Sequence, residues 1–402
     1  MKKPKHTPAP AAEEKDEALA DRLVALAIDL RESDVYATLP EELQKAHADL
    51  RRTINKCLQQ KREQALDEAL EHAYDEDAQA WRVLRENVAE MSGTMIVRRE
   101  QGADIEVNAF VIPLFVHTSG GLHFDQCFQD EQAFEQLRDS IREAGLESRK
   151  ANVVLVAHAY HLDEIERIGY CDLNTMVQEA HDAMTRKKAT SAEAIARSMR
   201  GWPPSSFEPG DSAVELRFLL GFALKTMDDP FYQVPQKESA ADRYFEERAE
   251  RLRKWTQQAT PLLQRCLVTD GREVRIDFLY QDLFHGGHDA AVAELEMLRL
   301  LSEVQDMLDT NGVAPQEVCA IIGPTEADDG EVVRVSLQAK GSDAAIGIVE
   351  KPLGRGDTVD GAIADIADGL AAVGLQDLRI ARKFDEDGVP FNVRSLQSAG
   401  RG

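Results

Sequence analysis

This chain of 402 residues lacks the common sequence motifs that identify a nucleotide-binding or catalytic site. It has no G-x-x-x-x-G-K-[ST] phosphate loop, no G-x-S-x-G nucleophile turn and no G-x-G-x-x-G that opens a helix after a strand. Such motifs place glycine backbone or an exposed nucleophile where phosphates and acyl groups react. Without them the chain offers no recognisable nucleotide-binding or serine-hydrolase site, and no cofactor is expected.

Cysteine is scarce, and long apolar runs are missing. The five cysteines are widely spaced and none belongs to a C-x-x-C pair: Cys57, Cys127, Cys171, Cys266 and Cys319. An odd, sparse set is typical of reduced thiols in a cytoplasmic protein rather than of a disulfide framework. The N-terminus "MKKPKHTPAPAAEEKDEA" lacks the apolar core of a secretory signal, and no segment has the roughly 18 apolar residues of a membrane span. The sequence therefore predicts a cytoplasmic protein with no membrane contact.

Positive charge is also in short supply. Acidic residues outnumber basic ones by 72 to 47, which gives a formal net charge of −25. Such a surface repels phosphate backbones, and no dense run of lysine and arginine offers a local basic patch, so the sequence argues against nucleic-acid binding. The acidity can serve solubility, or it can mimic nucleic acid toward a basic partner.

Apolar residues are patterned, first at helical and then at strand spacing. Between residues 17 and 92 they recur every three or four positions, for example at Trp81, Leu84, Val88 and Met91, which predicts a helical bundle. Beyond Gly93 the segments "ADIEVNAFVIPLF", "NVVLVAH" and "AVELRFLLGFALKT" are typical of strands, and helical patterns separate them.

These patterns predict an α+β or α/β protein, in which an N-terminal helical bundle precedes two α/β units with helices packed on sheets. The Pro/Ser/Gly segment "RGWPPSSFEPGDS" is the candidate linker between the units. The expected order is a flexible tail (1–16), the bundle (17–92), a first α/β unit (93–199), the linker (200–212), a second α/β unit (213–384) and a loose C-terminal tail (385–402).

A duplication could relate the two α/β units. "FVIPLFVHTSGG" (110–121) and "FLYQDLFHGGHD" (278–289) each end a strand with Leu-Phe and then pass through a Gly-Gly pair. A helical pattern and a buried strand follow each of them. Repetition of one α/β design would explain this likeness, and so would chance, since short apolar strands and glycine turns are common.

Histidines gather near these glycine pairs. His117, His123 and Cys127 surround the first, His158 and His161 end the strand "NVVLVAHAYH", and His285-Gly-Gly-His288-Asp289 forms the second. Converging strand ends could assemble a metal site from His285, His288 and His158, which would activate water for hydrolysis. The alternative is a plain turn, in which the glycines adopt positive φ and Asp289 is the N-cap of the next helix.

One further loop, "KPLGRGDTVDG" (351–361), precedes a helix that Thr358 is placed to cap. The helix amides could bind an anion there, although an ordinary loop explains the same residues.

The order of segments resembles an uncharacterised bacterial family, a domain of unknown function, over roughly residues 20–385. The segments that carry the resemblance are "DRLVALAIDL", "LDEALEHAYDEDAQAWRVLRENVAE", "RFLLGFALKTMDDPFYQ" and "VVRVSLQAKGSDAAIGIVEKPLG". The resemblance implies a shared fold, but no activity, cofactor or binding residue, because none of these segments is a catalytic signature. Some members have a C-x-x-C near the end, where this chain reads "FDEDGVPFNV", so the resemblance weakens the metal hypothesis.

The sequence favours a non-catalytic binding or regulatory protein whose partner is another protein or a small molecule. The observation behind this expectation is a well-patterned chain without a convergent catalytic set. The alternatives are a metal-assisted hydrolase that uses the histidine loops and an acidic mimic of nucleic acid.

Overall fold

The computed structural model describes residues 13–32, 40–123, 125–186, 214–327, 330–341, 345–354, 356–385 and 387–396. The chain forms two compact units, Met1–Ala291 and Val292–Gly402. Helices come first and mixed sheets follow, so the predicted α+β class is confirmed. The division between the units falls within a helix, α10 (Phe284–Asn311), whereas the linker expected at 200–212 lies outside the described residues.

The N-terminal bundle consists of α1 (Glu13–Leu30), α2 (Glu41–Gln59), α3 (Glu63–Glu76) and α4 (Ala78–Gly93). Each helix sends leucines from one face into a common core, including Leu23, Leu50, Leu66 and Leu84, all fully buried. The Asp77 carboxylate begins α4 by accepting hydrogen bonds from the amides of Gln79 and Ala80. Because α1 begins at Glu13, residues 13–16 are helical and do not belong to a tail; residues 1–12 lie outside the described part.

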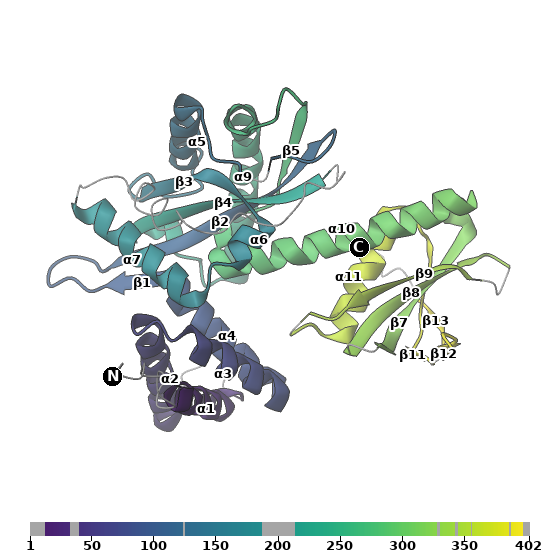
Figure 1. Ribbon diagram of the computed structural model, residues 1–402, viewed down its shortest axis with the longest axis horizontal. Coiled ribbons are helices and arrows are strands. Elements are labelled where there is room, and N and C mark those ends of the chain that lie inside the picture. Colours follow the sequence, from purple (N-terminus) through teal and green to yellow (C-terminus); the bar gives the residue numbers. More distant parts are fainter. Residues whose placement is uncertain are drawn as a thin grey trace, which may run out of the picture. The chain divides into compact units, whose positions relative to one another are not determined.

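An antiparallel sheet with strands of unequal length forms the centre of the first unit (Figure 1). Its strands are β1 (Thr94–Val97), β2 (Ile105–Thr118), β3 (Asn152–His161), β4 (Val214–Thr226), β5 (Val274–Phe278) and β6 (Asp282–Leu283). The order is β1-β2-β4-β3. β5 and β6 pair with later residues of β2, on the edge of β2 that also pairs with β1. β2 and β4 are buried on both faces over most of their length, as central strands are.

The sequence places β4 and β5 in a second α/β unit, and this is wrong: β4 pairs with β2 and β3, and β5 pairs with β2. Apolar residues fill both faces of β4, so it needs a strand on each side and cover on both faces, which the neighbouring β2 and β3 and the covering helices provide. Strand pairing is set by such nonlocal burial and not by the composition of the segment that precedes the strand.

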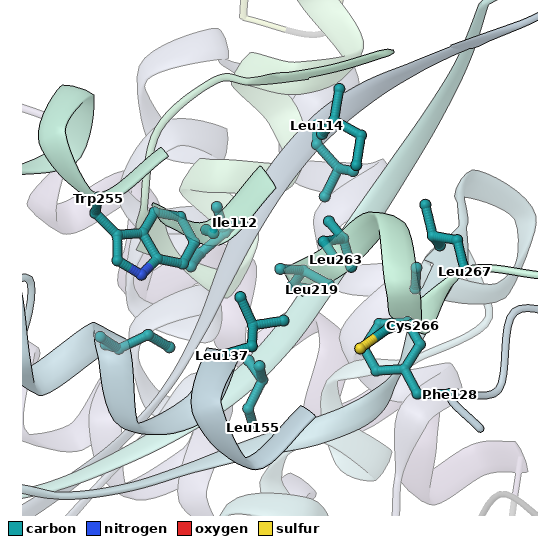
Figure 2. Packing of buried hydrophobic residues seen from close by; sticks show 14 of the residues in the cluster. Ile112, Leu114, Phe128, Leu137, Leu155, Leu219, Trp255, Leu263, Cys266 and Leu267 are labelled. Atoms are coloured by element: carbon teal, nitrogen blue, oxygen red, sulfur yellow. The ribbon is translucent and has the colours of Figure 1, made fainter. Parts of the chain in front are cut away.

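Helices cover both faces of this sheet (Figure 1). α5 (Glu131–Glu143) and α9 (Glu238–Cys266) lie on one face, where Leu137 and Leu263 pack with Ile112 and Leu219 (Figure 2). Trp255 is fully buried there and donates from Nε1 to Ser140 Oγ at 2.8 Å. The other face meets α4, α7 (Tyr170–Arg186) and the first turn of α10. The short α6 (Leu162–Glu166) follows β3 directly, and the 3₁₀ turn η1 (Pro230–Tyr232) follows β4.

The second unit contains a mixed sheet in the order β13-β10-β7-β8-β9. Its elements after α10 are η2 (Pro315–Glu317), β7 (Val318–Ala327), β8 (Gly330–Ala339), β9 (Ala345–Pro352), α11 (Val359–Ala372), β10 (Asp377–Ile380), β11 (Lys383–Phe384), β12 (Pro390–Phe391) and β13 (Arg394–Ser395). β10 is parallel to β7, and the expected hairpin is present as β8 and β9. The core of this unit joins Leu300, Val304 and Leu308 of α10 to Ile366 and Leu370 of α11.

The C-terminal tail expected from residue 385 is wrong over its described part. β12 pairs with β11, and β13 pairs with β10, so the chain stays in sheets up to Ser395. Strands of two residues leave too short a period-two pattern to be seen in the sequence. Among the described helices, none combines the length and the apolar character needed to cross a bilayer.

Candidate functional site

The second Gly-Gly pair lies inside the first turns of α10, and the turn predicted from the sequence is wrong. Neither Gly286 nor Gly287 has a positive φ. A Cβ at Gly287 would lie 2.5 Å from Val111 Cγ2 of β2, so glycine is needed there because the helix approaches the sheet closely. Asp289 is not an N-cap, since it lies in the helix and pairs with Arg85 of α4.

His285 is held in this packing layer as a neutral ring. Its Nε2 lies 3.0 Å from Ser92 Oγ, and its ring lies 5.0 Å from that of Tyr170. Burial lowers the pKa of His285 to about 4, with Arg85 also lowering it and Asp289 opposing. The ring is therefore uncharged at neutral pH and serves as a hydrogen-bonded part of the packing between α4, α7 and α10.

His288 faces different partners one turn along. Its Nδ1 lies 3.1 Å from Asp289 Oδ1, its Nε2 lies 4.0 Å from Glu166, and its ring stacks on Phe218 of β4. His158 contacts none of these groups and has its own set of partners. No group of three or more His, Cys, Asp or Glu side chains that could hold a metal exists in the part of the chain that the structure describes. A metal at His285, His288 and His158 therefore stays a prediction that this arrangement does not support.

The histidines at the first Gly-Gly pair each contact a separate acid. His117 Nε2 lies 2.7 Å from Asp277, and His123 Nε2 lies 2.5 Å from Asp270. Gly120 has a φ of 109°, so this pair does form a turn. The two similar stretches thus adopt different structures, a loop after β2 and a helical turn in α10.

Cys127 and His158 bring a thiol and an imidazole together outside the regular strands. They face each other across an isolated antiparallel bridge. The amide of Phe128 donates to Ala157 O at 2.9 Å, and the amide of Ala159 donates to Gln126 O at 3.2 Å. This pattern makes Cys127 and His158 a non-hydrogen-bonded pair, whose Cα atoms are about 4.5 Å apart and whose side chains are close.

Cys127 is exposed because its neighbours anchor the segment at every second position. Gln126 is fully buried and Phe128 packs in the core beside Cys266 and Leu267 (Figure 2), whereas Asp125 and Cys127 point to solvent.

Buried polar side chains hold the loop that carries Cys127 in place through hydrogen bonds to its backbone and to that of Val268. Gln126 donates from Nε2 to His123 O and Val268 O, and its Oε1 accepts from the Val268 amide at 2.8 Å. The buried Arg217 also donates to His123 O at 3.1 Å.

His158 lies among acids that favour its charged form. Its Nε2 is 3.1 Å from Glu164 Oε2, its Nδ1 is 3.8 Å from Asp125 Oδ1, and its side chain is 15% exposed. Burial lowers the pKa of His158, but hydrogen bonds to Cys127 and Glu164 and the charges of Glu164 and Asp125 outweigh it and raise this pKa to about 9. The ring is therefore an imidazolium at neutral pH.

Glu164 is oriented by the start of α6. One of its carboxylate oxygens, Oε2, accepts from the His161 amide at 2.7 Å, while His161 Nδ1 accepts from the Asp163 amide at 3.2 Å. This is a capping box in which a histidine replaces the usual serine or threonine. The same carboxylate therefore begins a helix and holds the His158 ring.

An exposed thiol, an imidazole and an orienting carboxylate are the groups of an activated cysteine nucleophile. The other four cysteines are buried. Burial raises the pKa of Cys57 and of Cys266 to about 11, and it also raises the pKa of Cys171 and of Cys319. Their thiols are therefore poor nucleophiles, and Cys127 is the exposed thiol among the five.

Sequence reasoning placed Cys127 near the first glycine pair and His158 at a strand end, and it did not join them. It missed Glu164 altogether. The signals available were the alternation in "DQCFQ", which exposes Cys127, and a Glu three residues after His161, which is the spacing of a capping box.

The loop at 351–361 is closed by its own side chains. Thr358 Oγ1 accepts from the Gly361 amide at 3.2 Å, as the sequence predicts for a cap, and Asp357 Oδ2 accepts from the Gly354 amide at 2.9 Å. The Thr358 hydroxyl therefore already occupies one of the helix amides that an anion could use.

Comparison with known proteins places the chain in a family. The family model described as "Protein of unknown function (DUF2863)" matches residues 9–391. No curated protein and no solved structure matches the chain. The match extends over nearly the whole sequence and confirms the resemblance to a domain of unknown function. The chain therefore belongs to the DUF2863 family.

Proposed function

We propose that this chain is a non-catalytic regulatory protein that responds to thiol-reactive compounds through Cys127. The observation that carries the proposal is the exposed thiol held against the imidazolium of His158, which Glu164 orients. Coulomb attraction between an imidazolium and a thiolate favours the nucleophilic form of a cysteine. Modification of the Cys127 thiol would change the binding of a partner, which is another protein or a small molecule, the partner classes expected from the sequence.

The chemistry is thiol–disulfide exchange with a low-molecular-weight disulfide. The Cys127 thiolate attacks one sulfur, the S–S bond of the reagent breaks, and a new S–S bond joins Cys127 to half of the reagent. The other half leaves as a thiolate and takes a proton from His158. With the other cysteines buried, the product is a stable mixed disulfide that a small thiol reverses.

Regulation is a better proposal than covalent catalysis, because acyl transfer needs hydrogen-bond donors for an oxyanion. The backbone amide of Cys127, which would be the nearest donor, already donates to Asp125 Oδ1 at 3.0 Å. We prefer it also to the metal-assisted hydrolase and the nucleic-acid mimic, since no geometry in the described residues favours either.

The experiment is a stopped-flow titration of the native protein with 4,4′-dithiodipyridine, a neutral disulfide whose released thiopyridone absorbs light. We expect one fast equivalent from wild type, none from Cys127→Ser, and one from the control Cys319→Ser, which alters a buried thiol. A fast equivalent that survives in Cys127→Ser would refute the proposal.

The regulatory half of the proposal has its own test. Native mass spectrometry of the purified protein before and after capping of Cys127 should show a change in the bound protein or small molecule. Cys127→Ser should show no change under the same treatment. Identical spectra for capped and uncapped wild type would contradict a regulatory role.

A further inference from the structure

Charged side chains lie close to Cys127. Asp125 is next but one in the chain and 81% exposed, and its carboxylate holds the Cys127 amide. Glu164 Oε2 lies 3.1 Å from His158 Nε2, and Asp125 Oδ1 lies 3.8 Å from His158 Nδ1. Two carboxylates therefore lie beside one imidazolium.

The cations nearby do not reverse this balance. His158 is 15% exposed and lies against Glu164, so its charge is largely compensated at the surface. Burial and the charge of Arg217 lower the pKa of His161, so that this ring adds no charge. Arg217 itself is buried and pairs with Glu215 at 2.8 Å.

On the neighbouring segments, Arg265 pairs with Asp130 at 2.8 Å and His123 pairs with Asp270. Of the charged groups named here, Asp125, two residues from Cys127, is the most exposed. The formal net charge of −25 for the whole chain acts in the same direction.

We infer that Cys127 selects thiol-reactive compounds that are cationic or neutral, such as disulfides of small amines, and discriminates against anionic ones. This inference rests on the proposed function, because it assumes that Cys127 is the reacting thiol. Attack on an anionic reagent brings a second negative charge beside Asp125 and the thiolate, whereas a cationic reagent is attracted to both. At separations of about 6–8 Å in water, the interaction between two unit charges changes a reaction rate by about two- to threefold. The rates of a cationic and an anionic reagent should therefore differ by about tenfold at low salt.

Methanethiosulfonates test this directly, since reagents with the same leaving group carry different charges. The thiolate displaces methanesulfinate, which leaves with the electron pair of the S–S bond. Rates of Cys127 with the trimethylammonium-ethyl, ethyl and sulfonatoethyl reagents are each divided by the rate of the same reagent with N-acetylcysteine amide. The expected cation-to-anion ratio is about tenfold in roughly 20 mM salt and falls toward one in roughly 0.5 M salt.

Asp125→Asn should lower the ratio by about four- to ninefold, because the cationic reagent loses a two- to threefold gain and the anionic reagent loses a two- to threefold penalty. The amide oxygen of the variant can still accept from the Cys127 amide but carries no charge. Asp75→Asn, which alters an exposed acid of α3 in the helical bundle, is the matched control and should leave the ratio unchanged. A ratio of one, or a preference for the anionic reagent, would overturn the inference while the proposed function stands. Failure of Cys127 to react with the neutral ethyl reagent faster than the model thiol would instead overturn the proposed function.

Discussion

The replacement of Gly287 by alanine tests the finding that α10 begins at Phe284 and packs closely on β2. The added Cβ would lie 2.5 Å from Val111 Cγ2, and Val111 is fully buried in a central strand, so neither side can easily move. Overpacking of this kind costs about 1–3 kcal/mol. Alanine gains up to about 1 kcal/mol over glycine in a helix, so we expect the free energy of unfolding to fall by about 1–2 kcal/mol.

Gly286→Ala is the matched control on the same turn. Its added Cβ would meet only the exposed carboxylate of Asp282 at 3.1 Å, and this side chain can rotate away. The small cost of moving the Asp282 side chain is then offset by the higher helix propensity of alanine. We expect the free energy of unfolding to change by no more than about 0.5 kcal/mol in either direction.

Urea titrations followed by circular dichroism measure these changes. A double-mutant cycle with Val111→Ala sharpens the test, since removal of Cγ2 should relieve the clash and give a favourable coupling of about 1 kcal/mol or more. Equal destabilisation by both glycine replacements, with no coupling to Val111, would refute the close approach and favour the positive-φ turn expected from the sequence.

Buried and capping side chains give three further predictions. Gly169→Ala would place a Cβ 2.5 Å from Oε1 of Glu63, whose carboxylate accepts hydrogen bonds from the first amides of α7. The variant should lose about 1–2 kcal/mol in free energy of unfolding and melt at a lower temperature. An unchanged melting temperature would contradict this capping. The pKa of His285, about 4 in the folded protein, lies below the unfolded value of about 6.5, so the unfolded state binds the proton first and stability should fall by up to about 3 kcal/mol between about pH 6.5 and 4. A His285→Gln variant that keeps the same slope would show that another group is responsible. The pKa of His158 is raised to about 9, so the charged ring contributes up to about 3 kcal/mol to the free energy of unfolding below about pH 6.5, and this contribution is lost as the pH rises through about 9. Denaturation curves of His158→Asn should therefore converge with those of wild type at high pH. A difference in stability that stays constant with pH would contradict the charged ring.

Local patterns of the sequence predicted the parts of the fold that depend on local burial. The helical period identified the faces that carry Leu23, Leu50, Leu66 and Leu84 into one core, because each helix needs only an apolar stripe to be recognised. Strand partners could not be predicted in the same way. β4 and β5 join β2 through pairing between segments far apart in the chain, and many pairings satisfy the same alternation.

The candidate site was predictable only in its separate pieces. Glycine is favourable both in a turn and at a close helix contact, so "HGGHD" could not reveal that Gly287 faces Val111. The pairing of Cys127 with His158 depends on an isolated bridge outside any regular strand pattern. Glu164 gained its role from the cap of a helix of five residues, which is too short to show a period.

The most direct test of the central claim compares the rate of Cys127 with 4,4′-dithiodipyridine at about pH 7 in wild type and in His158→Asn. An ordinary cysteine is only about 3% thiolate at this pH, so an adjacent imidazolium can raise the rate by at most about thirtyfold. The activated-thiol account predicts that His158→Asn reacts about tenfold more slowly than wild type. Equal rates in the two proteins would contradict it.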